Sequence, residues 1–414
     1  MENKQPELRN SATDISRFSQ QQQKTSSNTS QKAPTQTVDV LYIITKLELG
    51  GAQKVCISLF KDLKERDART FLISGIEGEL VCEVFTQQGV SLFPSFTREI
   101  SFSSALQEIR NFFTLVKAIR KIKKEHPKLI VHTHSTKAGI VGRWAAFFAG
   151  AKTRIHTVHG FAFHNNQPFW IWTPIYLAEL ITSFITTHFV CVSTADIRTG
   201  TRLFPRFAKK HSLIRAAVAW EQFHIPAHQA ISFPQSGPFI FGTIACFKPQ
   251  KNLFDLLEAF AEVYKKNRHT RLEIIGDGAL REKIEWWIKQ HELTEVITLH
   301  GWQHNVVPIM HNWHAFVLSS LWEGLPCAVV EARLLHLPVV CYRAGGIDDV
   351  INNGRNGFLV DQGKVYQLAQ RMYEISREHW LYNNLQNFPD ELKDFQTESM
   401  VDQHKRLYEH LTRP

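Results

Sequence analysis

Two kinds of apolar pattern alternate along this chain: short runs of consecutive apolar residues, and longer segments in which apolar residues recur every three or four positions. The short runs are typical of strands buried on both faces of a parallel sheet, and the longer segments predict amphipathic helices. We expect strands at residues 38–44, 69–74, 129–133, 154–158, 189–193, 211–215, 239–244, 272–275, 296–300, 315–318 and 338–341. Because helices are predicted between these strands, the fold class is α/β.

The same pattern divides the chain into regions. Residues 1–37 hold a glutamine run and few large apolar side chains, so we expect a disordered tail, because little burial would offset its ordering entropy. The first domain spans 38–225, and a proline-containing linker follows at 226–238. The strand pattern then restarts, which places the second domain at 239–392. Residues 393–414 form a closing helix with one apolar face.

Composition narrows the class of protein. A length of 414 residues fits two domains, and a formal charge of +9 favours an anionic partner: nucleic acid, an anionic membrane or a phosphate-bearing substrate. The six cysteines contain no CxxC pair and read as reduced core residues of a cytoplasmic protein. The N-terminus is too polar for a signal peptide. The longest apolar stretch, 169–192, is interrupted by Pro174, Glu179 and His188, and predicts a helix and a strand, not a membrane span.

The most informative loop follows the predicted strand 315–318. It holds Glu323, and Pro326 then suits the first position of a helix that carries Glu331 among apolar neighbours. Ligands bind at the carboxyl ends of parallel strands, and two carboxylates there suit a ligand rich in hydroxyls, such as a sugar or a ribose. The alternative is that Glu331 pairs with Arg333 or another basic residue and only closes the domain surface.

Other strand-end loops suit phosphate. Gly50 and Gly51 precede a helix and let backbone N–H groups approach an anion, although a tight turn also needs glycine. Lys248 and Lys251 lie in the loop after the first strand of the second domain. Two lysines there suit a diphosphate, although loop lysines are also often simply solvated.

These motifs together resemble those of the retaining glycosyltransferases of family 4. The resemblance covers residues 38–412 and rests on the two glutamates eight positions apart, the Glu-Gly-Leu-Pro sequence, the lysine loop, a Gly-Asp-Gly turn at 276–278 and the Gly-Gly pair at 345–346. It implies the GT-B fold: two Rossmann-like, doubly wound parallel-sheet domains that face a central cleft, with the final helix crossing back to the first domain. It also implies a nucleotide-sugar donor.

The resemblance implies roles for the donor side. Glu323 holds hydroxyls of the transferred sugar, Glu331 holds the ribose hydroxyls, and Lys251 and Lys248 offset charge on the leaving diphosphate. The remaining implied donor-binding residues are Gly50, Gly51, Gly276, Gly278, Gly324 and Leu325. One departure is Cys246, which stands where the family usually has an arginine, and Lys248 is the candidate replacement.

For the acceptor side, the segments 132–143 and 156–163 resemble the cleft loops of lipid- or polysaccharide-directed members. By that resemblance His159 lies beside the reacting sugar, and His134 and Lys137 face the acceptor. A second departure is Ala216 with its neighbour Ala217, where many members carry Asn-Gly.

We therefore expect a retaining transferase that uses a UDP- or GDP-sugar and a glycan or lipid-linked acceptor, in cell-surface polysaccharide or lipopolysaccharide assembly. No metal or other cofactor is expected, because the frequent histidines lack carboxylates or cysteines at ligand spacing. A sugar-nucleotide epimerase or a glycosyl phosphorylase on the same fold is the alternative enzyme. A basic nucleic-acid-binding protein is the alternative outside catalysis, but the aromatic residues lie in helical stripes and strands, so we expect no nucleic acid.

A cluster of basic residues ends the predicted helix 104–125. One interpretation is favourable charge at a helix C-terminus on a solvated face. The other is contact with an anionic membrane, which places the protein at the cytoplasmic face of the inner membrane. The residues are Lys117, Arg120, Lys121, Lys123 and Lys124.

Overall fold

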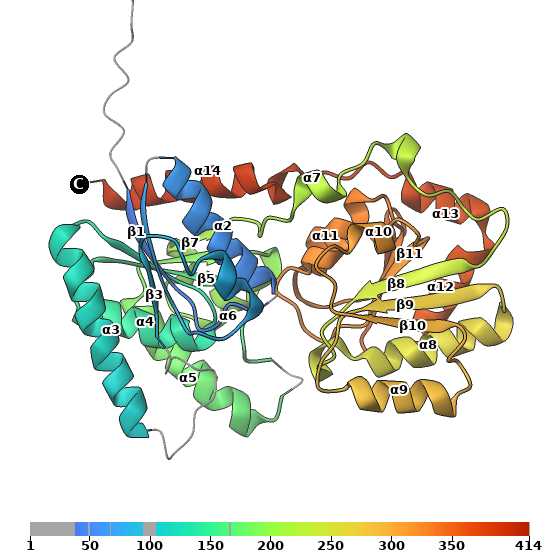
Figure 1. Ribbon diagram of the computed structural model, residues 1–414, viewed down its shortest axis with the longest axis horizontal. Coiled ribbons are helices and arrows are strands. Elements are labelled where there is room, and N and C mark those ends of the chain that lie inside the picture. Colours follow the sequence, from blue (N-terminus) through green and yellow to red (C-terminus); the bar gives the residue numbers. More distant parts are fainter. Residues whose placement is uncertain (1–37, 49, 67, 94–104, 165–166, 414) are drawn as a thin grey trace, which may run out of the picture. The chain divides into compact units, whose positions relative to one another are not determined.

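The computed structural model describes residues 38–48, 50–66, 68–93, 105–164 and 167–413. The predicted tail, residues 1–37, lies outside the described residues. Two parallel sheets with flanking helices make up the described chain (Figure 1). The predicted fold class is confirmed, whereas the residue limits of the two domains and the linker stay predictions.

The first sheet has seven strands in the order β3-β2-β1-β4-β5-β6-β7, and every pairing is parallel. The chain therefore winds outward from β1 in both directions, and the switch point lies between β1 and β4. The strands are β1 (Asp39–Ile43), β2 (Arg69–Ser74), β3 (Val90–Leu92), β4 (Ile130–Thr133), β5 (Thr153–Val158), β6 (His188–Cys191) and β7 (His211–Leu213).

The second sheet repeats this topology with six parallel strands in the order β10-β9-β8-β11-β12-β13. Its switch point lies between β8 and β11. The strands are β8 (Phe239–Ile244), β9 (Thr270–Ile275), β10 (Ile297–Gly301), β11 (Ala315–Leu318), β12 (Val339–Tyr342) and β13 (Gly357–Val360).

Helices cover both faces of each sheet. Along β1, Tyr42 belongs to one apolar cluster, while Leu41 and Ile43 belong to another, so successive side chains enter cores on opposite faces. The helices are α2 (Gly51–Glu65), α3 (Ala105–Glu125), α4 (Thr136–Phe148), α5 (Phe169–Ile185), α6 (Thr194–Leu203), α7 (Trp220–Phe223), α8 (Leu253–Lys266), α9 (Arg281–Gln290), α10 (Val307–Met310), α11 (Cys327–Leu334), α12 (Val365–Arg377), α13 (His379–Gln386) and α14 (Thr397–Thr412). Within the described part of the chain, no helix combines the length and apolar character needed to cross a membrane.

Every predicted strand overlaps a strand of the structure, but β3 and β13 were not predicted. β3 has three residues at a sheet edge, and β13 has four, of which the first is Gly357. Such short runs carry little periodic signal, and their pairing with β2 and β12 is what makes them strands.

The last helix, α14, packs against the first sheet although it follows the second in sequence. The Tyr408 hydroxyl lies 2.6 Å from His132 Nδ1 and 3.2 Å from the Tyr42 hydroxyl. Arg66, the residue directly after α2, pairs with Asp402 on α14. These contacts attach the C-terminal end of the chain to β1, β4 and α2.

Four histidines cluster where α14 meets the first sheet. The ring of His132 lies 4.6 Å from that of His134 and 5.7 Å from that of His404, and His134 contacts His159. Burial lowers the pKa of all four, to about 4 for His404 and about 3 for His159. The cluster is therefore neutral at pH 7.

This cluster predicts a loss of stability in mild acid. The unfolded chain binds protons at its histidines below about pH 6.5, whereas folded His404 binds one only near pH 4, so each such residue costs about 1.4 kcal/mol per pH unit in between. The free energy of unfolding is measured with urea at pH 7 and at pH 5. From pH 7 to pH 5, this free energy should fall by about 2 kcal/mol less in His404→Leu than in the wild type. His228→Leu, at an exposed histidine, is the control and should match the wild type. Equal pH dependence in all three proteins would contradict the prediction.

Candidate active site

A cavity of about 990 Å³ is lined by loops that follow strands of both sheets. The loops follow β1, β2, β5, β6 and β7 of the first sheet, and β8, β9, β10, β11, β12 and β13 of the second. All of them leave the carboxyl ends of parallel strands, where this topology places ligands. The cavity is large enough for a nucleotide-sugar-sized molecule.

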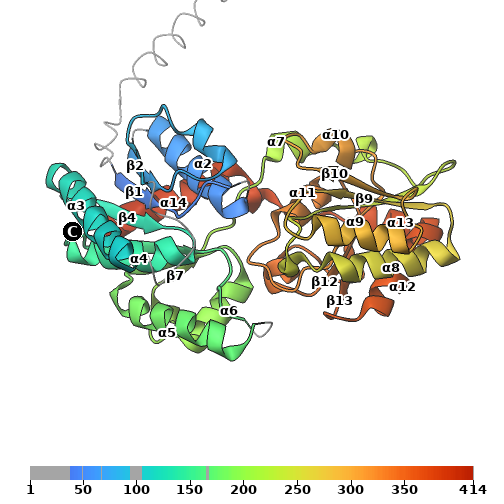
Figure 2. The same ribbon diagram turned by 60° about the horizontal axis from the view of Figure 1, so that its bottom comes forward.

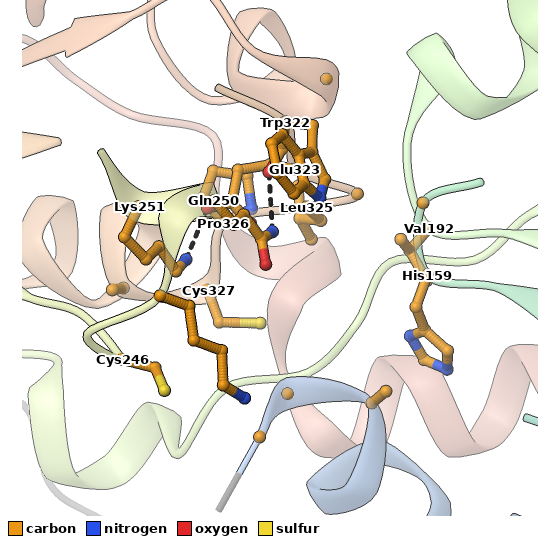
Figure 3. Close-up of a pocket in the computed structure, with 18 of the residues that line it drawn as sticks. His159, Val192, Cys246, Gln250, Lys251, Trp322, Glu323, Leu325, Pro326 and Cys327 are labelled. Carbon is orange, nitrogen blue, oxygen red and sulfur yellow. Dashed lines mark hydrogen bonds and ion pairs between the residues drawn. The ribbon is translucent and has the colours of Figure 1, made fainter. Parts of the chain in front are cut away.

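Lys251 and Glu323 form an ion pair inside this cavity, with 2.5 Å between Lys251 Nζ and Glu323 Oε1 (Figure 3). Lys251 ends a short 3-10 turn, and Asn252 after it adopts a left-handed conformation with φ 46°. The Ser319 hydroxyl lies 2.9 Å from the carbonyl oxygens of both residues. The end of β11 therefore fixes the lysine loop beside the loop that carries Glu323.

Gln250 connects the same two loops, and the sequence offered no signal for this. Its Nε2 donates to the Trp322 carbonyl at 2.7 Å (Figure 3), and its own carbonyl accepts from Leu321 N at 2.8 Å. Trp322 also stacks on His164 from the loop after β5, with ring centroids 4.0 Å apart. This stack crosses the cavity, because the two rings follow strands of different sheets.

Three loops meet at a contact that only glycine permits. Gly346 N donates to the Gly324 carbonyl at 2.8 Å. A Cβ at Gly324 would lie 2.3 Å from the His159 carbonyl oxygen and 2.7 Å from Gly160 N. A Cβ at Gly345, whose φ is 56°, would lie 1.8 Å from the Glu323 carbonyl oxygen. The glycines let the loop after β5 touch the loops after β11 and β12.

His159 lines the cavity (Figure 3). His134 contacts His159 from outside the cavity lining. His134 Nδ1 is 3.0 Å from His159 Nε2, and this hydrogen bond orients the His159 ring. Because burial keeps His159 neutral, it can exchange hydrogen bonds with a ligand but does not add a positive charge. His134 is itself fully buried and is not part of the cavity lining.

Lys137 likewise lies away from the cavity. Its Nζ is 2.7 Å from Glu108 Oε1 on α3. The acceptor-side roles predicted for His134 and Lys137 stay predictions, and the structure places neither side chain in the cavity lining.

Glu331 lies on α11, one turn beyond the cavity-lining Cys327. Of the predicted alternative, the pair with Arg333 is wrong, because Arg333 donates instead to Asp390 at 2.7 Å. Burial raises the pKa of Glu331, and the positive charge of Lys54 on α2 opposes that rise. This places a basic residue of the first domain near the predicted ribose site, which sequence reasoning missed.

The predicted glycine loops divide into lining and supporting positions. Gly50 and Gly51 line the cavity at the N-terminus of α2, and a Cβ on Gly51 would lie 3.3 Å from Cys327 Sγ. Gly278 also lines the cavity, whereas Gly276 lies outside the lining and packs against the backbone of Ala245. A Cβ on Gly276, whose φ is 126°, would lie 2.1 Å from the Ala245 carbonyl oxygen.

Most of the predicted site residues therefore share one cavity. Those that line it are Gly50, Gly51, His159, Lys248, Lys251, Gly278, Glu323, Gly324 and Leu325. Those outside its lining are His134, Lys137, Gly276 and Glu331. Cys246 lines it beside the exposed Lys248, so the cysteine and its candidate replacement lie in the same loop.

Asp196 is a further cavity-lining carboxyl group that the sequence did not reveal as such. The Ser193 hydroxyl donates to it at 2.7 Å, and burial raises the pKa of Asp196 to about 7. The Ser-x-x-Asp spacing signals a helix N-terminus, which α6 confirms, but it carries no signal for a ligand site.

In the described ranges, no group of three or more histidine, cysteine, aspartate or glutamate side chains could hold a metal ion. The expectation of no metal stays a prediction.

Two family models match the chain. Residues 49–215 match "Glycosyltransferase Family 4", and residues 225–388 match "Glycosyl transferases group 1". Among similar proteins, the Escherichia coli UDP-Gal:alpha-D-GlcNAc-diphosphoundecaprenol alpha-1,3-galactosyltransferase is 27% identical over 370 residues, covering 87% of this chain and 94% of that protein. The Staphylococcus aureus capsular polysaccharide biosynthesis glycosyltransferase CapM is 24% identical over 283 residues, covering 65% of this chain and 72% of its own.

Solved structures share the fold. Anabaena HepE in complex with UDP and glucose superposes with a TM-score of 0.74 at 17% identity, covering 89% of this chain and 99% of its own. Sucrose-phosphate synthase from Thermosynechococcus elongatus superposes with a TM-score of 0.70 at 18% identity, covering 90% of this chain and 99% of its own.

Proposed function

The chain belongs to the glycosyltransferases of family 4, with a group 1 glycosyltransferase domain in its second half, and we propose that it transfers a sugar from a UDP-sugar to a hydroxyl group of a lipid-linked acceptor, with retention at the anomeric carbon. The observation that carries the proposal is the Lys251–Glu323 pair, together with Lys248, in one cavity at the carboxyl ends of both sheets.

The diphosphate is the group that these lysines recognise. As the bond between the anomeric carbon and the diphosphate oxygen breaks, the diphosphate keeps the electron pair. Lys251 and Lys248 offset this growing charge, and the backbone N–H groups at the N-terminus of α2 add to their effect. No metal ion is needed for this step, since fixed positive groups supply the stabilisation.

Glu323 is the group placed to hold the transferred sugar. Its second carboxylate oxygen is available as an acceptor for sugar hydroxyls, while Oε1 contacts Lys251. Neutral His159 supplies a hydrogen-bonding group on the opposite wall, from the first sheet. The new bond forms between the acceptor oxygen and the anomeric carbon in the space between these two walls, on the face that the diphosphate leaves, and the proton of the acceptor hydroxyl passes to the leaving diphosphate.

The names of the relatives support the donor and acceptor classes of the proposal. The Escherichia coli relative's name specifies UDP-galactose and a diphosphoundecaprenol-linked sugar, and Anabaena HepE binds UDP. A UDP-sugar is therefore the preferred donor over a GDP-sugar. The CapM relative supports a place in cell-surface polysaccharide assembly. With a lipid-linked acceptor, the enzyme works at the cytoplasmic face of a membrane.

A binding screen tests the donor class directly. Thermal unfolding of the full chain is measured with UDP- and GDP-sugars in turn. A donor present at about 100 times its dissociation constant adds about 2.7 kcal/mol of stability. We expect UDP-sugars to stabilise the protein more than GDP-sugars, and the reverse order would overturn the donor assignment.

The ribose assignment predicts a separation between the two glutamates. Glu331→Ala should weaken UDP binding by about 10- to 100-fold, because hydrogen bonds to a charged group contribute about 1.5–3 kcal/mol. Glu323→Ala should spare UDP binding but reduce turnover. Calorimetry with UDP checks both, and Glu295→Ala, at an exposed carboxylate, is the matched control. Unchanged UDP affinity in Glu331→Ala would remove the ribose role.

A further inference from the structure

Helix α5 (Phe169–Ile185) has its apolar side facing outward. Six large apolar side chains of this helix are between 47% and 68% exposed. Those in its second half recur at helical spacing and share one face with the exposed Pro174. The six are Phe169, Trp170, Ile171, Leu177, Ile181 and Phe184.

The polar side of α5 faces the protein instead. Glu179 is buried and accepts two hydrogen bonds from Arg143 Nη2, at 2.7 and 2.9 Å. Thr182 accepts from Trp144 Nε1 at 3.0 Å. Both partners lie on α4, and Glu179 is the only charged residue in α5. This arrangement reverses the usual surface helix, in which charged side chains face water.

The exposed apolar surface continues onto neighbouring helices. Phe147 and Phe148, at the end of α4, are 44% and 53% exposed, and Phe113 on α3 is 58% exposed. Phe148 packs edge-on against Phe112 of α3, with ring centroids 5.9 Å apart. Both views show α3, α4 and α5 side by side (Figures 1 and 2). Contiguous apolar surface of this kind marks an interaction site.

Positive charge borders this apolar surface. Arg120 donates to the Phe148 carbonyl at 2.9 Å, and the guanidinium of Arg154 lies 5.5 Å from the Phe147 ring. Acidic groups beside them are few: Glu108 pairs with Lys137, and Glu125 ends α3. Further basic residues on this side are Lys117, Lys121 and Lys124, exposed on α3, the half-buried Lys123 beside them, and Lys152, exposed after α4.

We propose that α5 lies flat in the interface of an anionic lipid bilayer, with Leu177, Ile181 and Phe184 inserted among the acyl chains and the basic end of α3 bound to lipid phosphates. The uncharged apolar face complements the acyl chains of an anionic bilayer, and the clustered basic residues complement its negatively charged headgroups. The 17 residues of α5 rise about 26 Å, less than the roughly 30 Å of a hydrocarbon core, so the helix suits the bilayer surface. This proposal rests on the proposed function and extends it, because a lipid-linked acceptor is anchored in the bilayer to which α5 would bind.

The test is co-sedimentation of the full chain with vesicles of phosphatidylcholine and phosphatidylglycerol in equal amounts. The variant is Leu177→Ser with Ile181→Ser and Phe184→Ser, all at exposed positions. We expect it to reduce the partition coefficient at least about tenfold, since inserted apolar area sets binding strength. Neutralising Lys117, Arg120, Lys121 and Lys124 should remove the part of binding that salt weakens. The control is Trp286→Ser with Trp380→Ser, which removes large exposed apolar side chains outside α5 and should bind as wild type.

Two results would overturn the proposal. One is wild-type partition by the triple serine variant. The other is a concentration-dependent dimer of the wild type that binds no vesicles and becomes monomeric in the triple variant, which would make this face a contact between two copies. UDP binding, measured on the same samples, distinguishes the membrane-binding proposal from the proposed reaction. A triple variant that binds UDP normally but does not bind vesicles supports membrane binding by α5, independently of the identity of the acceptor. Vesicle binding by a wild type that transfers no sugar would leave the surface intact and count against the function.

Discussion

Replacing Lys251 by methionine should reduce kcat by about a hundred- to a thousandfold, as removal of a preorganised charge-stabilising group does. The substitution keeps the length of the side chain but removes the charge that lies 2.5 Å from Glu323. It also leaves the Glu323 carboxylate unpaired where the diphosphate is expected, so repulsion adds to the lost attraction. Single-turnover rates with a UDP-sugar and an acceptor measure the effect.

Two companion variants sharpen this result. Lys248→Met should also slow turnover, by at least about tenfold, if Lys248 replaces the arginine that Cys246 displaces. Lys289→Met, at an exposed lysine of α9 outside the cavity, should leave turnover unchanged. Near-normal turnover in Lys251→Met would contradict the assigned role. Near-normal turnover in Lys248→Met alone would mean that another group, such as the α2 N-terminus, supplies the missing charge.

Gly324→Ala should reduce kcat by at least about a hundredfold while the protein stays folded. The added methyl group would lie 2.3 Å from the His159 carbonyl oxygen and 2.7 Å from Gly160 N, so backbone on one side has to move. A displacement of about 1 Å at reacting groups is enough for a loss of this size. The affinity for UDP should change less than about tenfold, because the predicted nucleotide contacts of the second domain do not involve the contact between Gly324 and the loop after β5.

Gly354→Ala is the control for this substitution. Gly354 has a φ of 79°, and no atom lies within 4 Å of the position that a Cβ would take there. Alanine at this position therefore costs about 1–2 kcal/mol of backbone strain without any clash. It should lower stability and spare turnover. If Gly324→Ala and Gly354→Ala have equal turnover, the contact between Gly324 and the loop after β5 has no part in catalysis.

Much of the fold followed from local pattern. Strands such as β4 and β11 are buried along their whole length and therefore read as continuous apolar runs. The rule that ligands bind at the carboxyl ends of parallel strands then predicts that Glu323, Lys251 and His159 lie near one another. All three line one cavity in the structure, and their roles there stay predictions.

Other features depend on tertiary contacts and left no local signal. Gln250 joins two loops that are 72 positions apart in sequence. The Trp322–His164 stack and the charge of Lys54 near Glu331 each bring together side chains that follow strands of different sheets. Composition and periodicity report only on neighbours in sequence, so these partners were beyond prediction. The outward apolar face of α5 was hidden for a related reason, since periodicity finds an apolar face but not the direction in which it points.

The most direct test of the proposed reaction is the anomeric configuration of the product. The full chain is incubated in EDTA with an α-linked UDP-sugar and a lipid-linked acceptor, and the new linkage is assigned by NMR. Retaining transfer predicts an α-linked product that forms only when acceptor is present and without added metal. A β-linked product would contradict retention, and an epimerised nucleotide-sugar formed without acceptor would contradict the transfer reaction itself.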